Sequence, residues 1–360
     1  MQVIFRADAS THIGSGHVMR CLTLAEELRD NGCEVTFVCR ELPGNLISII
    51  EEKGYFVSPL EWQDDSNTFN WQKDVCETIN TIESKAEKVD LLIVDHYKID
   101  FKWESKIRDY AKQIMVIDDL ADRNHDSDLL LDQNYYCDLE SRYEGLVPEY
   151  CLKLLGPRYL LLRQEYIEAR ENLLPRNGEI KQILIFFGSS DIDGHTLTVL
   201  RAIESIKLLD INILVVVGAS NPNRKEVELY CSGKPNVSFY CQVDNMAELM
   251  ASVDLAIGAG GASMWERCFL GLPSITVILA DNQKKNTEDV DKSGAIKYLG
   301  WAHDLLEEDY ICAVQWMISN PKKVREMSEK SQLIMTNNTR TGSEIVAYTV
   351  LSLREKLPKL

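Results

Sequence analysis

The sequence predicts an α/β protein built from two doubly wound, Rossmann-like halves. Short apolar runs rich in valine, isoleucine and leucine alternate with helix-patterned segments over nearly the whole chain, which is the pattern of parallel βαβ units. Residues 91–94 are apolar at every position, as expected for a strand that helices cover on both faces. Glycine-rich loops join apolar runs to helices in both halves, and ligands of such sheets bind beyond the carboxyl ends of the strands.

The first half of the chain contains five apolar runs that predict strands. These strands are expected at 3–5, 35–39, 91–95, 114–117 and 129–131. Helices are expected at 21–29, at 46–53, ahead of 87 and at 101–110, with a loop at 61–70. Gly32 and Gly54 mark the ends of the first two helices, because glycine readily adopts the backbone conformation that ends a helix.

The second half begins a new alternating series after a linker. Residues 170–178 include Pro175 and Gly178 and have the composition of a helix end and a linker. Strands are then expected at 183–187, 213–217, 237–240, 255–257 and 273–279, and helices at 263–270, 305–318, 322–335 and 343–353. Because 360 residues exceed one typical domain, we predict a first domain over 1–170, a second over 178–345 and a C-terminal helix over 346–360.

The composition argues against several classes of function. A formal net charge of −17 disfavours a nucleic-acid partner, because neutralising nucleic-acid phosphates needs a surplus of lysine and arginine. No apolar run approaches the ~20 residues of a membrane span, and the N-terminus lacks the pattern of a signal peptide. The ten cysteines are scattered without a Cys-x-x-Cys pair. We therefore expect a cytoplasmic protein without structural zinc and without a membrane partner.

Residues 12–20 form the most informative stretch, a glycine loop between the first strand and the first helix. Gly14 and Gly16 allow a ligand to approach the backbone closely, and the helix N-terminus behind them suits a phosphate. His17 adds a group that accepts a proton near neutral pH. The loop lacks the third glycine of a dinucleotide fingerprint and the lysine of a P-loop, so taken alone it is equally consistent with a tight turn.

Arg6 and Asp8 lie at the end of the same first strand. A carboxylate beside a catalytic imidazole holds the ring in place and stabilises its charged form. We therefore predict that Asp8 orients His17 and that Arg6 and Asp8 belong to the substrate site.

A second glycine-rich loop, residues 258–266, also joins an apolar strand to a helix. In one interpretation Gly260, Gly261 and Ser263 hold a phosphate at the helix N-terminus, and Glu266 accepts hydrogen bonds from a ribose. In the other, Ser263 and Glu266 form a capping box and serve only the helix. The density of glycine exceeds what a cap needs, which favours the nucleotide site.

Three further motifs follow apolar strands and give weaker signals. Asp95-His96-Tyr97 either packs locally or meets a sugar. Asp118-Asp119 has the look of a metal pair, but no further carboxylate spacing supports a metal site, so turn or cap roles are favoured. Asn282, in a run that ends one strand and begins a helix, either lies in a helix cap or contacts the ligand.

Residues 6–10 (Arg-Ala-Asp-Ala-Ser) and 13–25 (Ile-Gly-Ser-Gly-His-Val-Met-Arg-Cys-Leu-Thr-Leu-Ala) closely resemble the hydrolases of pseudaminic acid biosynthesis. Those enzymes remove UDP from UDP-2,4-diacetamido-2,4,6-trideoxy-β-L-altropyranose. The family is similar to glycosyltransferases of the two-domain GT-B type and is related to the N-acetylglucosaminyltransferase that makes lipid II. Further motifs fall in the family's order along most of the chain, namely 95–97, 155–157, 161–163, 258–266 and 282–283.

The resemblance implies a GT-B-like fold, in which two Rossmann-like domains face each other across a cleft, and a catalytic role for His17. That histidine corresponds to the family's general base, which activates water for attack at the anomeric carbon as UDP leaves. The implied partners are a UDP-sugar and water, with no cofactor and no essential metal, and we expect a monomer. The implied nucleotide-binding residues are Gly260, Gly261, Ser263 and Glu266. The implied substrate-binding residues are Arg6, Asp8, Gly14, Gly16, Tyr97 and Asn282.

One segment departs from the family's pattern. Members usually carry Gly-Gly-Ser-Asp-x-x-Asn after the first strand of the second domain, whereas this chain has Ser189 for the second glycine and Gly194 for the asparagine. The sequence therefore leaves open the substituents of the sugar, as well as cleavage at carbon or at phosphorus. Two other functions also remain open: a UDP-sugar glycosyltransferase with a hydroxyl acceptor, and a nucleotide-sugar-binding protein without turnover.

Overall fold

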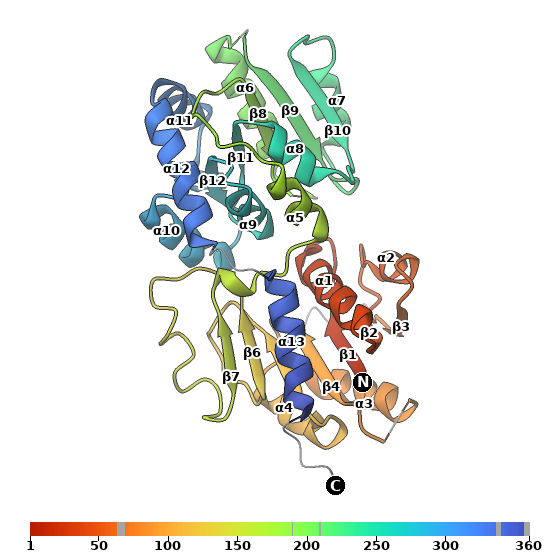
Figure 1. Cartoon of the computed structure of the whole chain (residues 1–360). Helices are drawn as coiled ribbons and strands as arrows, with labels where there is room; N and C mark the ends of the chain where they lie inside the picture. Colours follow the sequence, from red (N-terminus) through yellow and green to blue (C-terminus); the bar gives the residue numbers. More distant parts are fainter. Residues whose placement is uncertain (63–68, 86, 189, 209, 336–339, 356–360) are drawn as a thin grey trace. The chain divides into compact units, whose positions relative to one another are not determined.

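The computed structural model describes residues 1–62, 69–85, 87–188, 190–208, 210–335 and 340–355. The chain divides into two compact units. Unit 1 contains Met1–Asn134, Asp138–Leu161 and Thr339–Leu360, and unit 2 contains Tyr135–Cys137 and Leu162–Asn338. Each unit is built on one parallel sheet with helices around it (Figure 1). The predicted α/β class, with two doubly wound halves, is confirmed.

The described part of unit 1 contains a seven-stranded parallel sheet with the order β3-β2-β1-β4-β5-β6-β7. Its strands are β1 Gln2–Ala7, β2 Glu34–Arg40, β3 Phe56–Leu60, β4 Leu91–Asp95, β5 Ile114–Ile117, β6 Leu129–Asp132 and β7 Leu152–Leu155. The direction of winding reverses between β1 and β4, where Ala7 pairs with Asp95 at the carboxyl ends of the two strands. Such a switch point is where ligands of open α/β sheets bind.

Helices cover both faces of this sheet because successive strand residues point to opposite sides. Val3 and Phe5 of β1 pack in one core with α1 (Gly16–Asp30), α2 (Ile47–Glu52) and α13 (Gly342–Glu355). Ile4 points to the other core, with α3 (Trp71–Glu83) and α4 (Phe101–Ile107). Two short 3-10 helices, η1 (Arg108–Tyr110) and η2 (Pro157–Tyr159), complete the described helices of the unit.

The described part of unit 2 contains a six-stranded parallel sheet with the order β10-β9-β8-β11-β12-β13. Its strands are β8 Gln182–Phe186, β9 Asn212–Val217, β10 Val237–Cys241, β11 Leu255–Ala259, β12 Ser274–Ile278 and β13 Lys297–Trp301. Winding reverses between β8 and β11, so the loop after β11 lies at the switch point of this second sheet. This is the loop that the sequence predicts as the nucleotide site.

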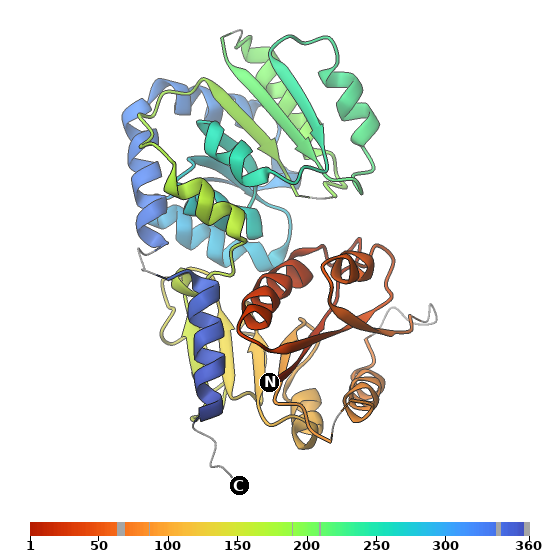
Figure 2. The same cartoon turned by 45° about the vertical axis from the view of Figure 1, so that its right-hand side comes forward.

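Helices also lie on both sides of the second sheet (Figure 2). One face packs against α6 (His195–Ile206), α7 (Arg224–Cys231), α11 (Glu307–Ser319) and α12 (Pro321–Ile334). The helices that follow β10, β11 and β12 are α8 (Met246–Ser252), α9 (Ala262–Phe269) and α10 (Lys284–Ser293), and they contact β8, β11 and β12. Helix α5 (Gln164–Glu171) packs against α8 and α9, while η3 (Asp281–Gln283) and η4 (Ala302–Asp304) follow β12 and β13.

Three strands, β3, β7 and β13, were not predicted from the sequence. All three are edge strands, which carry more polar residues than central strands because one side meets solvent. β3 contains Pro59, a residue that strands tolerate mainly at sheet edges because it cannot donate a hydrogen bond. Every strand that the sequence predicts is present in the structure.

The division into units differs in detail from the predicted domain boundaries. The chain leaves unit 1 at Leu161, and α5 belongs to unit 2 because it packs on α8 and α9. The C-terminal helix α13 belongs to unit 1, since Val346, Ala347 and Val350 are buried in the same core as α1. None of the helices in the described ranges is both long and apolar enough to span a membrane.

Candidate functional site

The first candidate site lies at the carboxyl ends of β1 and β4 in unit 1. The loop between β1 and α1 folds back on itself, because the Gly14 N–H donates to the Ser10 carbonyl at 2.8 Å and the Ser10 hydroxyl accepts from the Ile13 N–H at 2.9 Å. Gly14 has φ +82°, a conformation that favours glycine. This turn delivers His17 to the first turn of α1, beside the end of β4.

His17 is buried and is held through one ring nitrogen. Its Nδ1 lies 2.5 Å from Oδ1 of Asp95, the last residue of β4, and the Tyr97 ring packs edge-on against the imidazole with centroids 4.5 Å apart. Among the described residues, His17 Nε2 has no hydrogen-bond partner. Arg20 Nη2 lies 3.2 Å from the same Nδ1, but the Asp95 oxygen is closer, at 2.5 Å. Because an ionised carboxylate only accepts hydrogen bonds, Asp95 places the proton of the neutral imidazole on Nδ1. Nε2 then carries the lone pair that accepts a proton.

Arg20 holds the Asp95 carboxylate in place, and that carboxylate in turn orients His17. Its Nε and Nη2 donate to the two oxygens of Asp95 at 2.6 and 2.7 Å, and its Nη1 donates to Asp119 at 3.1 Å. Burial by itself raises the pKa of Asp95, but the Arg20 guanidinium and His17 together lower that pKa well below its ordinary value. Asp95 therefore stays ionised throughout the neutral range.

Asp132, at the end of β6, lacks a bidentate arginine contact of this kind, and its pKa is shifted in the opposite direction. It is as buried as Asp95 and accepts from Arg142 Nε at 3.0 Å, but Asp119 lies near it as a second negative charge. Burial and Asp119 raise the pKa of Asp132 to about 7. Two aspartates at the carboxyl ends of strands in one sheet therefore have pKa values that are shifted in opposite directions. The bidentate contact with Arg20 is what distinguishes Asp95.

The prediction that Asp8 orients His17 is wrong. Asp8 accepts from Arg6 at 2.6 and 2.9 Å and lies 3.3 Å from His96 Nε2. Asp95, which ends β4, thus contacts His17 after β1, and Asp8, which follows β1, contacts His96 after β4. His96 differs from His17 because its second nitrogen accepts the Lys98 N–H at 3.1 Å, which leaves no free lone pair on the ring.

Arg6 and Asp8 belong to the framework under the loop. Their side chains are 0% and 2% exposed, and Arg6 also pairs with Asp74 at 2.6 Å. We therefore reassign both residues from the predicted substrate contacts to support of the strand end and of His96. The two glycines of the loop have a different setting, since a Cβ built on Gly14 or Gly16 meets no heavy atom within 4 Å.

The second candidate site is the loop between β11 and α9 in unit 2. A Cβ on Gly258 would lie 2.1 Å from the Phe186 carbonyl oxygen, and one on Gly260 would lie 2.2 Å from Thr287 Oγ1 of α10. Gly261 is the N-cap residue of α9. Close packing of strand and helices therefore requires glycine at positions 258 and 260, and this brings the α9 N-terminus to the switch point, where its first N–H groups lack intrahelical acceptors.

Ser263 and Glu266 do not form the capping box that was the alternative interpretation. Ser263 lies inside α9, and its Oγ accepts a hydrogen bond from Arg267 Nη1 at 3.1 Å. Glu266 Oε1 instead faces Arg163 Nη2 at 3.3 Å, and its side chain is 18% exposed. Neither side chain therefore caps α9.

Asn282 lies in η3, next to the same loop. Its neighbour Gln283 accepts the Leu279 N–H at 3.0 Å, and the Gln283 amide nitrogen would lie 3.3 Å from a Cβ on Gly261. The segment that contains Asn282 therefore packs against the start of α9, and Asn282 itself is half-buried.

Other motifs singled out in the sequence make contacts that support the fold. Asp118 accepts the Ala121 N–H at 2.9 Å, a turn role, and pairs with Arg123 at 2.9 Å. Across the described ranges, no group of three or more histidine, cysteine, aspartate or glutamate side chains is arranged to hold a metal ion. Of the departures from the family pattern, Ser189 lies outside the described residues, and Gly194 has φ +74° at the N-cap position of α6.

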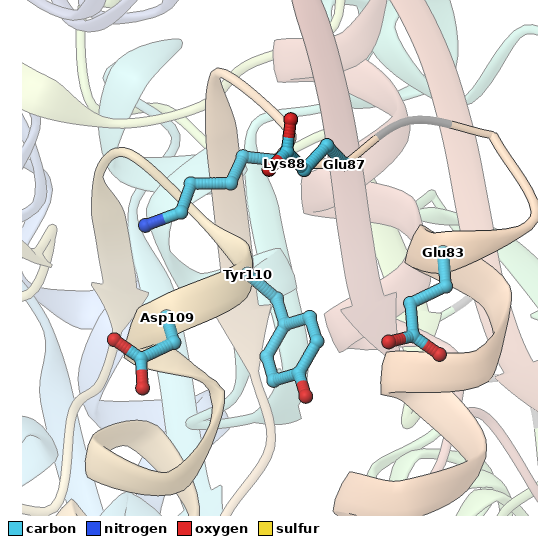
Figure 3. Close-up of a pocket in the computed structure, with 5 residues that line it drawn as sticks. All are labelled: Glu83, Glu87, Lys88, Asp109 and Tyr110. Atoms are coloured by element: carbon cyan, nitrogen blue, oxygen red, sulfur yellow. The ribbon is translucent and has the colours of Figure 1, made fainter.

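A hollow of about 410 Å³ in unit 1 lies away from these sites (Figure 3). It is lined by Glu83, Glu87, Lys88, Asp109 and Tyr110. Lys88 and Tyr110 precede β4 and β5, so the hollow is at the amino ends of the strands, opposite the edge that carries His17.

Sequence reasoning missed Asp95 and Arg20 as partners of His17. Asp95 stands at the end of an apolar strand, and Arg20 lies three residues after His17. Both positions are therefore recognisable in the sequence as candidates for the site. Their contact depends on β1 and β4 being neighbours, and the order of strands in a sheet cannot be read from one sequence.

Comparisons with known proteins agree with this architecture. Residues 182–343 match the glycosyltransferase family 28 C-terminal domain. The UDP-2,4-diacetamido-2,4,6-trideoxy-β-L-altropyranose hydrolase of Campylobacter jejuni is 31% identical over 82% of this chain and 97% of its own length. An uncharacterised protein of Methanocaldococcus jannaschii is 32% identical over 80% of this chain, which spans 58% of that relative.

A solved structure supports the same fold. MurG of Acinetobacter baumannii superimposes with a TM-score of 0.68 at 16% identity, over 98% of this chain and 99% of that chain. The fold is therefore the GT-B fold, as the sequence resemblance implied.

Proposed function

Because this chain belongs to the family of the UDP-2,4-diacetamido-2,4,6-trideoxy-β-L-altropyranose hydrolases, we propose that it hydrolyses that UDP-sugar to UDP and the free sugar in pseudaminic acid biosynthesis. The observation that carries the proposal is the geometry of His17. One ring nitrogen is held by the ionised Asp95, and the other has no partner among the described residues. This is the arrangement of a general base.

In the proposed reaction His17 acts as the general base. Nε2 of His17 takes a proton from a water molecule as the water oxygen forms a bond to the anomeric carbon. The bond between that carbon and the diphosphate oxygen breaks, and its electron pair leaves with UDP. Asp95, kept ionised by Arg20, stabilises the imidazolium that forms. General-base catalysis of this kind contributes roughly 10²–10⁴-fold in rate.

The leaving diphosphate would be stabilised in unit 2. The first N–H groups of α9 and the Ser263 hydroxyl are donors suited to phosphate oxygens, and Gly260 and Gly261 supply backbone at the same point. Glu266 is partly exposed and is suited to accept hydrogen bonds from a ribose diol. Gly14, Gly16, Tyr97 and Asn282 remain proposed contacts to the sugar and diphosphate.

One experiment tests the reaction. The protein is incubated with a panel of UDP-sugars, including the diacetamido-trideoxy-altropyranose, without any acceptor, and UDP and free sugar are measured. We expect stoichiometric UDP and free sugar. In ¹⁸O-labelled water the label should enter the sugar, and label found in UDP instead would contradict attack at carbon.

A second candidate function is glycosyl transfer to a hydroxyl acceptor. The match of residues 182–343 to a glycosyltransferase domain favours it. The same incubation separates the two functions, because a transferase releases UDP only after an acceptor is added. Tight binding of the UDP-sugar with no UDP release under either condition would instead indicate a binding protein.

We also propose that the protein acts in the cytoplasm. None of the ten cysteines, all of which lie in the described ranges, forms a disulfide bond, which supports a reducing compartment. The monomeric state and independence of a metal, both expected from the sequence, stay predictions.

A further inference from the structure

Arg267 of α9 is a buried cation without an ionic partner. Its side chain is among the largest fully buried ones, as is that of Arg6. Arg6 contacts two carboxylates, Asp8 and Asp74, each at 2.6 Å. In the described part of the chain Arg267 forms no ion pair, and its hydrogen bonds go to neutral oxygens only. A buried charge normally requires a paired charge, so this one needs an explanation.

The guanidinium lies at an unfavourable end of its helix. Arg267 is in the last turn of α9, but its side chain extends back toward the N-terminus, as helical side chains do. Its Nη1 donates to Ser263 Oγ at 3.1 Å and its Nη2 to the Ala259 carbonyl at 2.8 Å, while its buried Nε has no hydrogen-bond partner. A helix N-terminus already carries partial positive charge, so the cation there adds to an uncompensated positive potential.

Arg176 is the informative comparison within unit 2. It is only half-buried, but it also forms no ion pair among the described residues and also has a buried Nε without a hydrogen-bond partner. However, it donates to the Met250 and Val253 carbonyls at the C-terminal end of α8, where a helix favours a cation. Burial lowers the pKa of both arginines to about 10. The charge of Arg176 is thus stabilised by a helix C-terminus, whereas the charge of Arg267 has no such local stabilisation.

The contact with Ser263 has a directional consequence. A guanidinium only donates hydrogen bonds, so Ser263 Oγ accepts from Arg267. The Ser263 hydroxyl proton is then left for an acceptor on another side of the oxygen. A donor hydroxyl polarised by a cation, next to the free N–H groups of α9, is suited to an anionic oxygen.

We propose that Arg267 is a positioning residue for a nucleoside diphosphate: it turns the Ser263 hydroxyl into a donor toward a phosphate oxygen and supplies positive charge beneath the N-terminus of α9. This inference rests on the proposed nucleotide site and deepens it. Because the cation is unpaired until the anion binds, Arg267 serves binding at the expense of stability in the free protein.

The experiment measures UDP affinity by calorimetry and Tm with and without UDP, on the full chain. Arg267→Met keeps the length of the side chain and removes its charge. We expect its Tm without UDP to equal or exceed that of the wild type, and its Kd for UDP to rise roughly ten- to a hundredfold. Arg176→Met is the matched control, which should lower Tm by removing the helix C-cap contacts and leave UDP affinity unchanged.

Ser263→Ala tests the directional step. It should weaken UDP binding. Because the two residues act through one hydrogen bond, Arg267→Met should weaken UDP binding less in the Ser263→Ala background than in the wild-type protein. If Arg267→Met does not fold, wild-type UDP affinity in Ser263→Ala overturns the inference.

The remaining outcomes separate this inference from the proposed function. Wild-type UDP affinity in a folded Arg267→Met variant, with or without a lower Tm, would assign Arg267 a purely structural role and overturn the inference alone. Absence of UDP binding by the wild-type protein would instead overturn the nucleotide site and the inference with it.

Discussion

The two glycine loops occupy equivalent places in the two sheets, each after a strand at the switch point, but their glycines have opposite surroundings. A Cβ added to Gly14 or Gly16 would enter open space, whereas one added to Gly260 would lie 2.2 Å from Thr287 Oγ1. The first loop keeps room beside its backbone, and the second uses glycine to pack a strand against helices. Glycine density alone therefore does not show which loop a ligand approaches.

The charged groups next to the two loops differ in the same way. In unit 1, Arg20 is fully committed to Asp95 and Asp119, and this pairing orients a base. In unit 2, Arg267 has no ionic partner in the described ranges and lies under a helix N-terminus. We therefore expect substitutions around the first loop to change turnover and substitutions around the second to change nucleotide affinity.

The largest effect among the supporting residues is expected for Asp95→Asn. An amide retains most of the shape but loses the charge that fixes the proton of His17 on Nδ1, so the ring is free to misplace its lone pair. We predict a fall in kcat of about 10²-fold with UDP affinity unchanged, measured by steady-state kinetics and calorimetry.

Asp118→Asn is the matched control for Asp95→Asn. It alters an equally buried aspartate that follows the neighbouring strand β5 and pairs with its own arginine, Arg123. It should leave kcat unchanged. Equal losses in the two variants would mean that Asp95 acts only through stability.

A second prediction concerns the glycines themselves. Gly260→Ala forces a Cβ against Thr287 and should lower the free energy of unfolding by about 1–3 kcal/mol. Gly16→Ala places its Cβ in open space and should change that free energy by no more than ~0.5 kcal/mol while lowering turnover. Urea denaturation of both variants measures the two free energies of unfolding. A Gly16→Ala variant less stable than Gly260→Ala would contradict the proposed difference between the loops.

A smaller effect is expected for Glu266→Gln. A carboxylate accepts hydrogen bonds from both hydroxyls of a ribose through two oxygens, whereas an amide has one acceptor oxygen. We predict a roughly tenfold rise in KM and in Kd for UDP with kcat unchanged.

Glu165→Gln is the control for this substitution, because Glu165 contacts the same Arg163 at 2.7 Å but is not proposed to meet the ribose. Its KM should equal that of the wild type. A kcat defect in Glu266→Gln would contradict the division of roles between the units.

The central strands could be predicted from the sequence because their environment is uniform. Residues buried on both faces, such as 91–94, are apolar at every position, and no polar position blurs the pattern. The edge strands β3, β7 and β13 were missed, since a half-solvated edge accepts Pro59 and scattered charges. Their existence depends on neighbours distant in the sequence.

The residues of the site were predictable where a motif is continuous along the chain. Gly14, Gly16 and His17 stand within four residues, and their combination of flexible backbone and titratable ring points to chemistry. The partner of His17 was assigned to Asp8 because that residue is near in sequence. The structure brings Asp95 there instead, through a register between β1 and β4 that no local pattern encodes.

We propose that the catalytic base, His17, lies in unit 1 and that UDP binds to unit 2. The most direct test is His17→Asn, with turnover and UDP affinity measured on the same preparation. We predict that hydrolysis falls by roughly 10²–10⁴-fold while Kd for UDP stays at the wild-type value. Turnover near that of the wild type, or loss of UDP binding in the folded variant, would contradict it.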